Sequence, residues 1–248
     1  MTKLLLLAMT AVPALAREPM PGLLDEQPVY KWSAPPLESG EWIAGVGVVA
    51  HGLTDNTTIA TEASSVLLGF YNVRLHTRVA DPERAHVSLD AGLGVVTPIA
   101  LARLAVPEWP SRPPLLIADV GVPITWDLQP GTFFTLRPWA SVAAGRVREG
   151  DGRGVELLGR AGLTGVGTGG VLEVHVARNL GFVVGQELGA DAHGGPARLV
   201  GRTTGGLLFG VGKVRANVGL GVVTAVPLTV RGAPVFRPVP AFEVWARW

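Results

Sequence analysis

The chain contains no cysteine among its 248 residues. Without thiols it has no disulfide framework, no thiolate ligands for a metal, and no cysteine after a leader peptide to carry a lipid. Long apolar runs are missing too, because no interior stretch offers the roughly 18 uninterrupted apolar residues of a transmembrane helix. These absences exclude a disulfide-stapled domain and a lipoprotein anchor, and they leave no evident transmembrane helix.

The chain also lacks an excess of charge of either sign. Its formal net charge is +1, and residues 1–16 hold a single charged side chain, Lys3. The rest of the chain is therefore neutral overall, and it contains no run of basic residues. Because nucleic-acid binding depends on clustered positive charge, the sequence predicts no nucleic-acid partner.

Apolar residues are abundant despite the missing runs. They make up 48% of the chain, charged residues only 17%, and the mean hydropathy is +0.35. A lipid-facing β-barrel has this composition, since its apolar residues are spread one in two along many strands. A β-rich secreted protein with a large core is the alternative.

The first 40 residues divide into two segments that precede the predicted fold. Lys3, the apolar residues 4–9 and the sequence Ala14-Leu15-Ala16 are typical of a signal peptide over 1–16. Residues 17–40 hold five prolines and predict an extended periplasmic lead-in, with a partial plug as the minor alternative. The sequence thus predicts export, with a barrel domain over 41–248.

The last seven residues, 242–248, alternate with a period of two and end on Trp248. Phe242, Val244, Ala246 and Trp248 share one face of this predicted strand. The segment resembles the C-terminal strand of bacterial outer-membrane β-barrel proteins, in a small or porin-like class with no specific family indicated. The resemblance implies an outer-membrane location, contact with outer-membrane lipid, and recognition of 242–248 by the barrel-assembly machinery.

The same alternation recurs from Glu41 onward and predicts an all-β, closed antiparallel transmembrane barrel. Residues 87–95 illustrate it, with Val, Leu and Ala on one face and Ser, Asp and Gly on the other. We expect about ten strands, with eight or twelve left open. They span 41–50, 58–79, 85–105, 115–126, 132–147, 155–177, 180–190, 198–211, 214–222 and the terminal strand.

A closed barrel is favoured over a sandwich by the composition of the second face. That face is often Gly, Ser or Thr, whereas the solvent face of a sandwich would carry frequent charges. Glycine suits the narrow interior of a small barrel, whose strands must bend. Aromatic residues near strand ends are candidates for interfacial girdles: Trp42, Tyr71, Trp126 and Trp248.

Polar residues on the second face are candidates to line the lumen. They are Asn72, Arg74, His76, Arg78, Asp90, Asp119, Arg137, Glu173, His175, Glu187, Arg202, Arg215, Asn217, Glu243 and Arg247. Acids and bases are similar in number, so a salt-bridge network filling a small barrel is one interpretation. A polar path for a small solute is the other.

Three other chemistries were considered. Glu173 and His175 supply two metal ligands, but a site needs a third. His51, Asp55 and His193 fall in predicted loops where a hydrolase could assemble a catalytic set, although no nucleophile motif accompanies them. The glycines of 165–170 lack the strand-to-helix setting of a phosphate-binding loop.

The sequence therefore predicts a narrow passive channel, or a structural or surface-binding barrel, with a polar, Gly-rich lumen. It predicts no enzymatic activity, no catalytic or metal-binding residues and no cofactor. A hydrolase at the outer rim, acting on lipid or peptide, and a soluble secreted β-sandwich are the alternatives.

Overall fold

The computed structural model describes residues 35–63, 66, 70–96, 115–144, 164–177, 179–191, 197–211, 213–227 and 235–248. The predicted signal peptide, most of the lead-in, and the predicted strand ends at 97–105 and 155–163 lie outside these ranges. No helix within them is long and apolar enough to cross a membrane.

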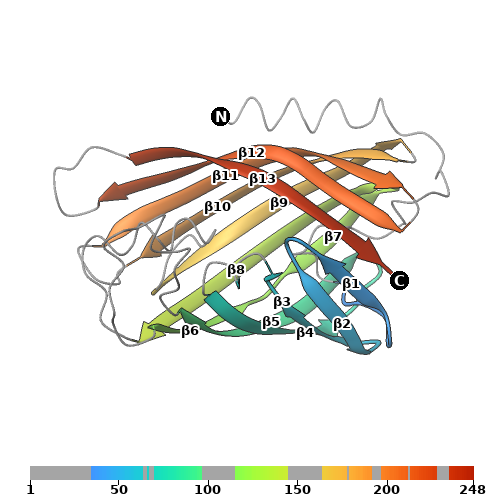
Figure 1. Cartoon of the computed structure of the whole chain (residues 1–248), viewed down its shortest axis with the longest axis horizontal. Helices are drawn as coiled ribbons and strands as arrows, with labels where there is room; N and C mark the ends of the chain where they lie inside the picture. The colour runs from blue at the N-terminus through green and yellow to red at the C-terminus, as the bar shows by residue number, and fades with distance from the viewer. Residues whose placement is uncertain are drawn as a thin grey trace.

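Thirteen strands are formed within the described residues, and neighbouring strands are antiparallel (Figure 1). They are β1 (Trp42–Gly45), β2 (Val49–Thr54), β3 (Thr57–Thr61), β4 (Phe70–Ala80), β5 (Ala85–Val96), β6 (Leu115–Gly121), β7 (Ile124–Gln129), β8 (Thr132–Ala144), β9 (Gly165–Ala177), β10 (Leu180–Asp191), β11 (Arg198–Val211), β12 (Val214–Pro227) and β13 (Val235–Arg247).

The sheet closes into a barrel because β1 pairs with β13, with Ala44 opposite Ala246. β6 and β7 lie end to end between β5 and β8, since each pairs with both of those strands. Pro123 separates them, and proline cannot donate a ladder hydrogen bond. Thirteen strands therefore occupy twelve positions, which confirms the predicted all-β closed antiparallel barrel.

The expected number of ten strands is wrong because two predicted strands are hairpins. The predicted strand 41–50 turns between β1 and β2, where the Gly45 amide donates to the Val48 carbonyl at 2.8 Å. Val46 and Val48 continue the apolar alternation through this turn, so the alternation alone did not reveal the turn. The predicted strand 58–79 divides in the same way into β3 and β4.

Apart from the links 46–48 between β1 and β2 and 122–123 between β6 and β7, the connections between strands sort by length onto the two ends of the barrel. Links of two to four residues (55–56, 81–84, 130–131, 178–179 and 212–213) lie at the end where β1 begins and β13 ends. Links of six or more residues (62–69, 97–114, 145–164, 192–197 and 228–234) join strands at the opposite end. We call these the short-turn end and the long-loop end.

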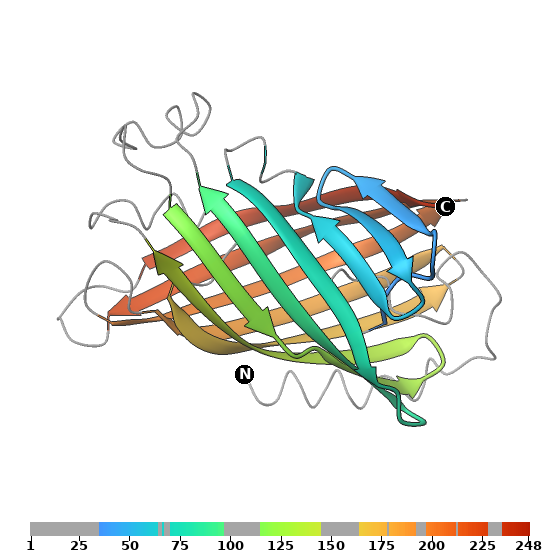
Figure 2. The ribbon, with the colours of Figure 1, turned by 90° about the horizontal axis from the view of Figure 1, so that it is seen from below.

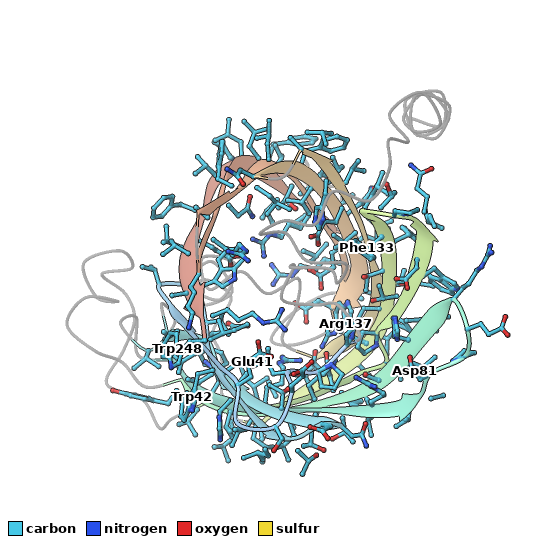
Figure 3. All side chains as sticks on the ribbon, turned by 90° about the vertical axis from the view of Figure 1, so that its right-hand side faces the viewer. Glu41, Trp42, Asp81, Phe133, Arg137 and Trp248 are labelled. Atoms are coloured by element: carbon cyan, nitrogen blue, oxygen red, sulfur yellow. The ribbon has the colours of Figure 1, made fainter. Side chains whose placement is uncertain are left out.

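The two faces of the wall differ as the alternation predicts. Large apolar side chains are exposed on the outside of every long strand, including Leu93, Leu116, Val142, Leu188, Leu207 and Leu220. Trp42, Trp126 and Trp248 lie on strands at the short-turn end, and Tyr71 lies near the long-loop end. In Figure 3 the view runs along the barrel, with Glu41 and Arg137 inside it and Trp42 and Trp248 at its outer surface.

Glycine on the inner face makes room for bulky side chains. A Cβ atom on Gly167 would lie 2.6 Å from the Trp139 ring, and one on Gly189 would lie 2.7 Å from the same ring. The indole of Trp139 therefore packs against these two glycines of β9 and β10. This contact explains the glycines at positions 167 and 189.

Candidate lumen site

The cross-strand registers place all fifteen predicted lumen residues on the inner face of the barrel. His76 is opposite Asp90, Glu187 is opposite Arg202, and Asn217 is opposite Glu243. The residues do not gather in one place. They form separate clusters along the wall, and their functional roles stay predictions.

The largest cluster surrounds Asp90 on β5. His76 Nδ1 is hydrogen-bonded to one carboxylate oxygen of Asp90, and Arg137 Nε donates to the other at 2.9 Å. Arg74 reaches Asp90 at 3.7 Å and binds Asp119 at 2.8 Å. Gly92 and Gly121 open space for this cluster, because a Cβ on either would collide with Asp119 or Arg137.

A second cluster lies toward the long-loop end. Both Nε and Nη2 of Arg198 donate to Asp191 Oδ2, at 3.1 and 2.9 Å. The Thr164 amide donates to the other oxygen of Asp191 at 3.2 Å. This cluster joins the start of β11 to the end of β10.

A third cluster joins the two strands that close the barrel. Arg247 on β13 donates through Nε to Glu41 Oε1 and through Nη2 to Glu41 Oε2, the latter at 3.0 Å. Glu41 immediately precedes β1, so this two-pronged ion pair reinforces the short β1–β13 ladder.

Glu173 and His175 form a fourth, smaller pair on β9. His175 Nε2 lies 2.7 Å from Glu173 Oε1, and the Phe133 ring meets the imidazole edge-on at 5.5 Å. Both side chains are buried. The described residues contain no group of three or more His, Asp or Glu side chains placed to hold a metal ion.

The ion pairs of the first three clusters share an order of exposure. The side chain of Arg74 is 25% exposed and that of Asp119 only 8%. The side chain of Arg198 is 28% exposed and that of Asp191 only 1%. Arg247 is 25% exposed against 18% for Glu41. In each of these three pairs the guanidinium group is therefore more exposed than the carboxylate that it binds.

The charged residues of the turns around His86, at the short-turn end, show the opposite order. His86 contacts Asp81 through Nδ1 and lies 3.4 Å from Asp127 through Nε2, and both acids are exposed. Arg78 also binds Asp81, at 3.3 Å. These turns therefore present carboxylates to solvent.

Several of these residues were not among the predicted site residues. Three of them, Glu41, Asp191 and Arg198, flank segments that were interpreted as lead-in or loop. Each nevertheless falls at a position where the alternation of its neighbouring strand points side chains into the barrel. Extending the inward–outward alternation by one position beyond the last apolar residue of each strand would have identified them.

The catalytic set considered for the outer rim is not brought together. His51 stacks on Trp42 at 4.1 Å between ring centroids, and Asp55 lies in the link between β2 and β3. Both are at the short-turn end, whereas the long links that hold His193 join strands at the other end. His193 itself lies outside the described residues.

Comparison with known proteins indicates a fold and no family. No family model matches the chain, and no curated protein matches its sequence. Among solved structures, LpxR from Salmonella typhimurium matches 85% of this chain and 89% of its own, with 13% identity and a TM-score of 0.44. At that identity the likeness concerns the fold alone, and no residue role is transferred.

The comparison corrects one prediction. The sequence was interpreted as that of a non-enzymatic barrel, and this prediction is wrong, because LpxR is an outer-membrane enzyme with a barrel of this kind.

Proposed function

We propose that the protein is an integral outer-membrane barrel whose lumen binds small anionic groups. Membrane insertion is supported by the closed ladder, because hydrocarbon tolerates no unpaired backbone, and by the exposed apolar side chains around the wall. The short-turn end faces the periplasm in this proposal, as in other outer-membrane barrels. The predicted signal peptide supports export.

The proposal for the lumen rests on the ion pairs in which the arginine side chain is more exposed than the acid. Arg74, Arg198 and Arg247 each present a guanidinium group above a less exposed acid. An anion in the lumen meets these groups first, and guanidinium binds carboxylate or phosphate oxygens in a two-pronged manner. The narrow channel proposed from the sequence would thus prefer anions.

Conductance across a planar bilayer tests this preference. Under a salt gradient, we expect the wild-type reversal potential to indicate anion preference, because the accessible charges are guanidinium groups. Arg198→Gln should lower the anion-to-cation permeability ratio by roughly twofold, since it removes one of these charges. Lys213→Gln, the same charge loss in the exposed link between β11 and β12, should leave the ratio unchanged. Cation preference, or no current at all, would contradict the proposal.

A second candidate function is hydrolysis inside the barrel, and one observation favours it. Asp90 holds His76 through Nδ1, which is the arrangement that orients an imidazole as a general base. The side chain of His76 is partly accessible to the lumen. An ester bound near the guanidinium of Arg74 would lie beside this base.

Cleavage of a chromogenic acyl ester by the folded barrel tests the second candidate. We expect His76→Gln to lower the rate at least about 100-fold, because removal of a general base costs that much. His175→Gln removes an imidazole that also pairs with an acid, and it should leave the rate within a factor of about two if catalysis depends on His76. A wild-type barrel without cleavage, or equal losses in both variants, would rule out this role for His76.

A further inference from the structure

Two of the arginine–aspartate pairs lie on a single row of the inner wall. Residues directly opposite one another on neighbouring antiparallel strands share a face, so the registers can be followed from strand to strand along the inner face. From β4 to β11 the row consists of Arg74, Gly92, Asp119, Ser141, Gly165, Asp191 and Arg198. The seven strands that carry it are consecutive in the wall (Figure 2). We call these residues the arginine row; an ion pair lies at each of its ends.

The two ends of the arginine row have the same chemistry. Arg74 binds Asp119 at 2.8 Å, and Arg198 binds Asp191 at 2.9 Å. In both pairs the arginine side chain is partly exposed and the aspartate side chain is much less so. Guanidinium groups bind phosphate and carboxylate oxygens through directed hydrogen bonds. Each end of the row therefore suits one anionic group.

The stretch between the two pairs is uncharged. Only Ser141 and Gly165 of the row lie there, and the Ser141 hydroxyl group is buried without a hydrogen-bond partner among the described residues. On the short-turn side of this stretch, the indole ring of Trp139 packs against Gly167 and Gly189. The stretch is thus bordered by an aromatic ring and contains an unsatisfied donor. A neutral, weakly polar spacer suits it better than a third charge.

The registers also set the distance between the two pairs. Asp119 on β6 and Asp191 on β10 are separated by the steps from β6 to β8, from β8 to β9 and from β9 to β10. Neighbouring strands are about 4.8 Å apart, so the two acids are about 14 Å apart along the wall, and less in a straight line because the wall curves. Since each guanidinium group lies beside its own acid, a ligand that meets both needs anionic groups roughly 10–14 Å apart.

We infer that the arginine row is a two-point binding site for an extended molecule with a phosphate or carboxylate group at each end and an uncharged spacer between them. One anionic group binds at Arg74 and the other at Arg198, and the spacer follows Ser141 and Gly165. This inference rests on the proposed anion-binding lumen, and it names the class of anion. A molecule held at one end presents its second anionic group at high effective concentration to the other.

Isothermal titration calorimetry of the folded barrel in detergent micelles tests the two-point site. The probes are oligo(ethylene glycol) chains with a phosphate at both ends, in lengths that place the phosphates from about 5 to about 20 Å apart when extended. All members of the series carry the same charge, so only the span differs. Arg198→Gln removes one end of the site. Lys213→Gln, in the exposed link between β11 and β12, is the matched loss of one charge.

We expect the affinity to be highest for a span of about 10–14 Å and at least about tenfold above that of the 5 Å probe, because only the longer probe reaches both arginines. Arg198→Gln should reduce this advantage to less than about threefold, whereas Lys213→Gln should retain it. The length series on the wild type requires no substitution, so it decides the question even if Arg198→Gln folds poorly.

Two results would overturn the two-point site and leave the anion-binding lumen intact. One is an affinity that is the same for all spans, and the other is a preferred span that survives Arg198→Gln. A wild-type barrel that binds none of the probes would overturn the anion-binding lumen, and the two-point site with it.

Discussion

Replacing Asp90 by alanine is expected to lower the free energy of unfolding by about 3–5 kcal/mol, because it leaves buried cations without their partner. Asp90 is buried and accepts from His76 and Arg137, and Arg74 lies 3.7 Å away. Arg137 is buried as well, so its guanidinium group has little access to compensating water. The urea midpoint of the folded barrel in vesicles, with the slope held common, measures the loss.

The matched control is Asp81→Ala at the short-turn end. Asp81 also pairs with an arginine and a histidine, Arg78 and His86, but its side chain is exposed. Exposed pairs of this kind contribute roughly 0–1 kcal/mol. Equal losses for the two variants would show that the Asp90 cluster is solvated, and would remove the basis for a dense ion network in the lumen.

Leu220→Arg is expected to lower stability in lipid by about 2–4 kcal/mol, the cost of a cation on the lipid face near the bilayer midplane. The Leu220 side chain is 72% exposed and lies in the middle of β12 on the outer face. A soluble protein would tolerate arginine at such an exposed position without loss. The variant therefore separates a lipid-facing wall from a water-facing one.

Leu53→Arg is the control for depth in the membrane. Leu53 is also exposed on the outer face, but it lies one residue from the short-turn end of β2. A cation near the interface costs about 0–1 kcal/mol. If both variants fold and unfold like the wild type in vesicles, the outer face does not contact hydrocarbon.

The alternation of single residues was enough to predict the class of fold and the two faces of the wall. It works because a strand in a barrel meets two different environments, and side chains such as Leu93 and Asp90 report them locally. The number of strands was not predictable in this way. Val46 and Val48 occupy a turn yet keep the apolar alternation, so the hairpin between β1 and β2 carries no local signal.

The position of prolines also misled the sequence interpretation. Pro238 falls between the predicted strands 214–222 and 242–248, and proline weakens a strand that is paired on both sides. In the structure it lies within β13, on the edge that no described strand covers. The sequence of β13 does not show that one of its edges is uncovered there, since this depends on the short length of β1, the strand beside it.

The grouping of the lumen residues likewise required the structure. Asp90 and Arg137 are 47 positions apart, and their contact depends on the registers of β5, β6, β7 and β8. Alternation places both on the inner face but says nothing about which residues lie opposite one another. The order of exposure within each ion pair, which carries the proposed anion site, follows only from that packing.

Heat modifiability combined with fractionation tests the central claim, that the chain is a closed barrel in the outer membrane. The protein is expressed with its signal segment, the envelope is fractionated, and unboiled and boiled samples are compared on a detergent gel. The account predicts that the protein is found in the outer-membrane fraction and changes mobility only after boiling, because the hydrogen-bonded ladder of a closed barrel resists detergent. A protein that is recovered in the soluble periplasmic extract and runs identically before and after boiling would contradict the claim.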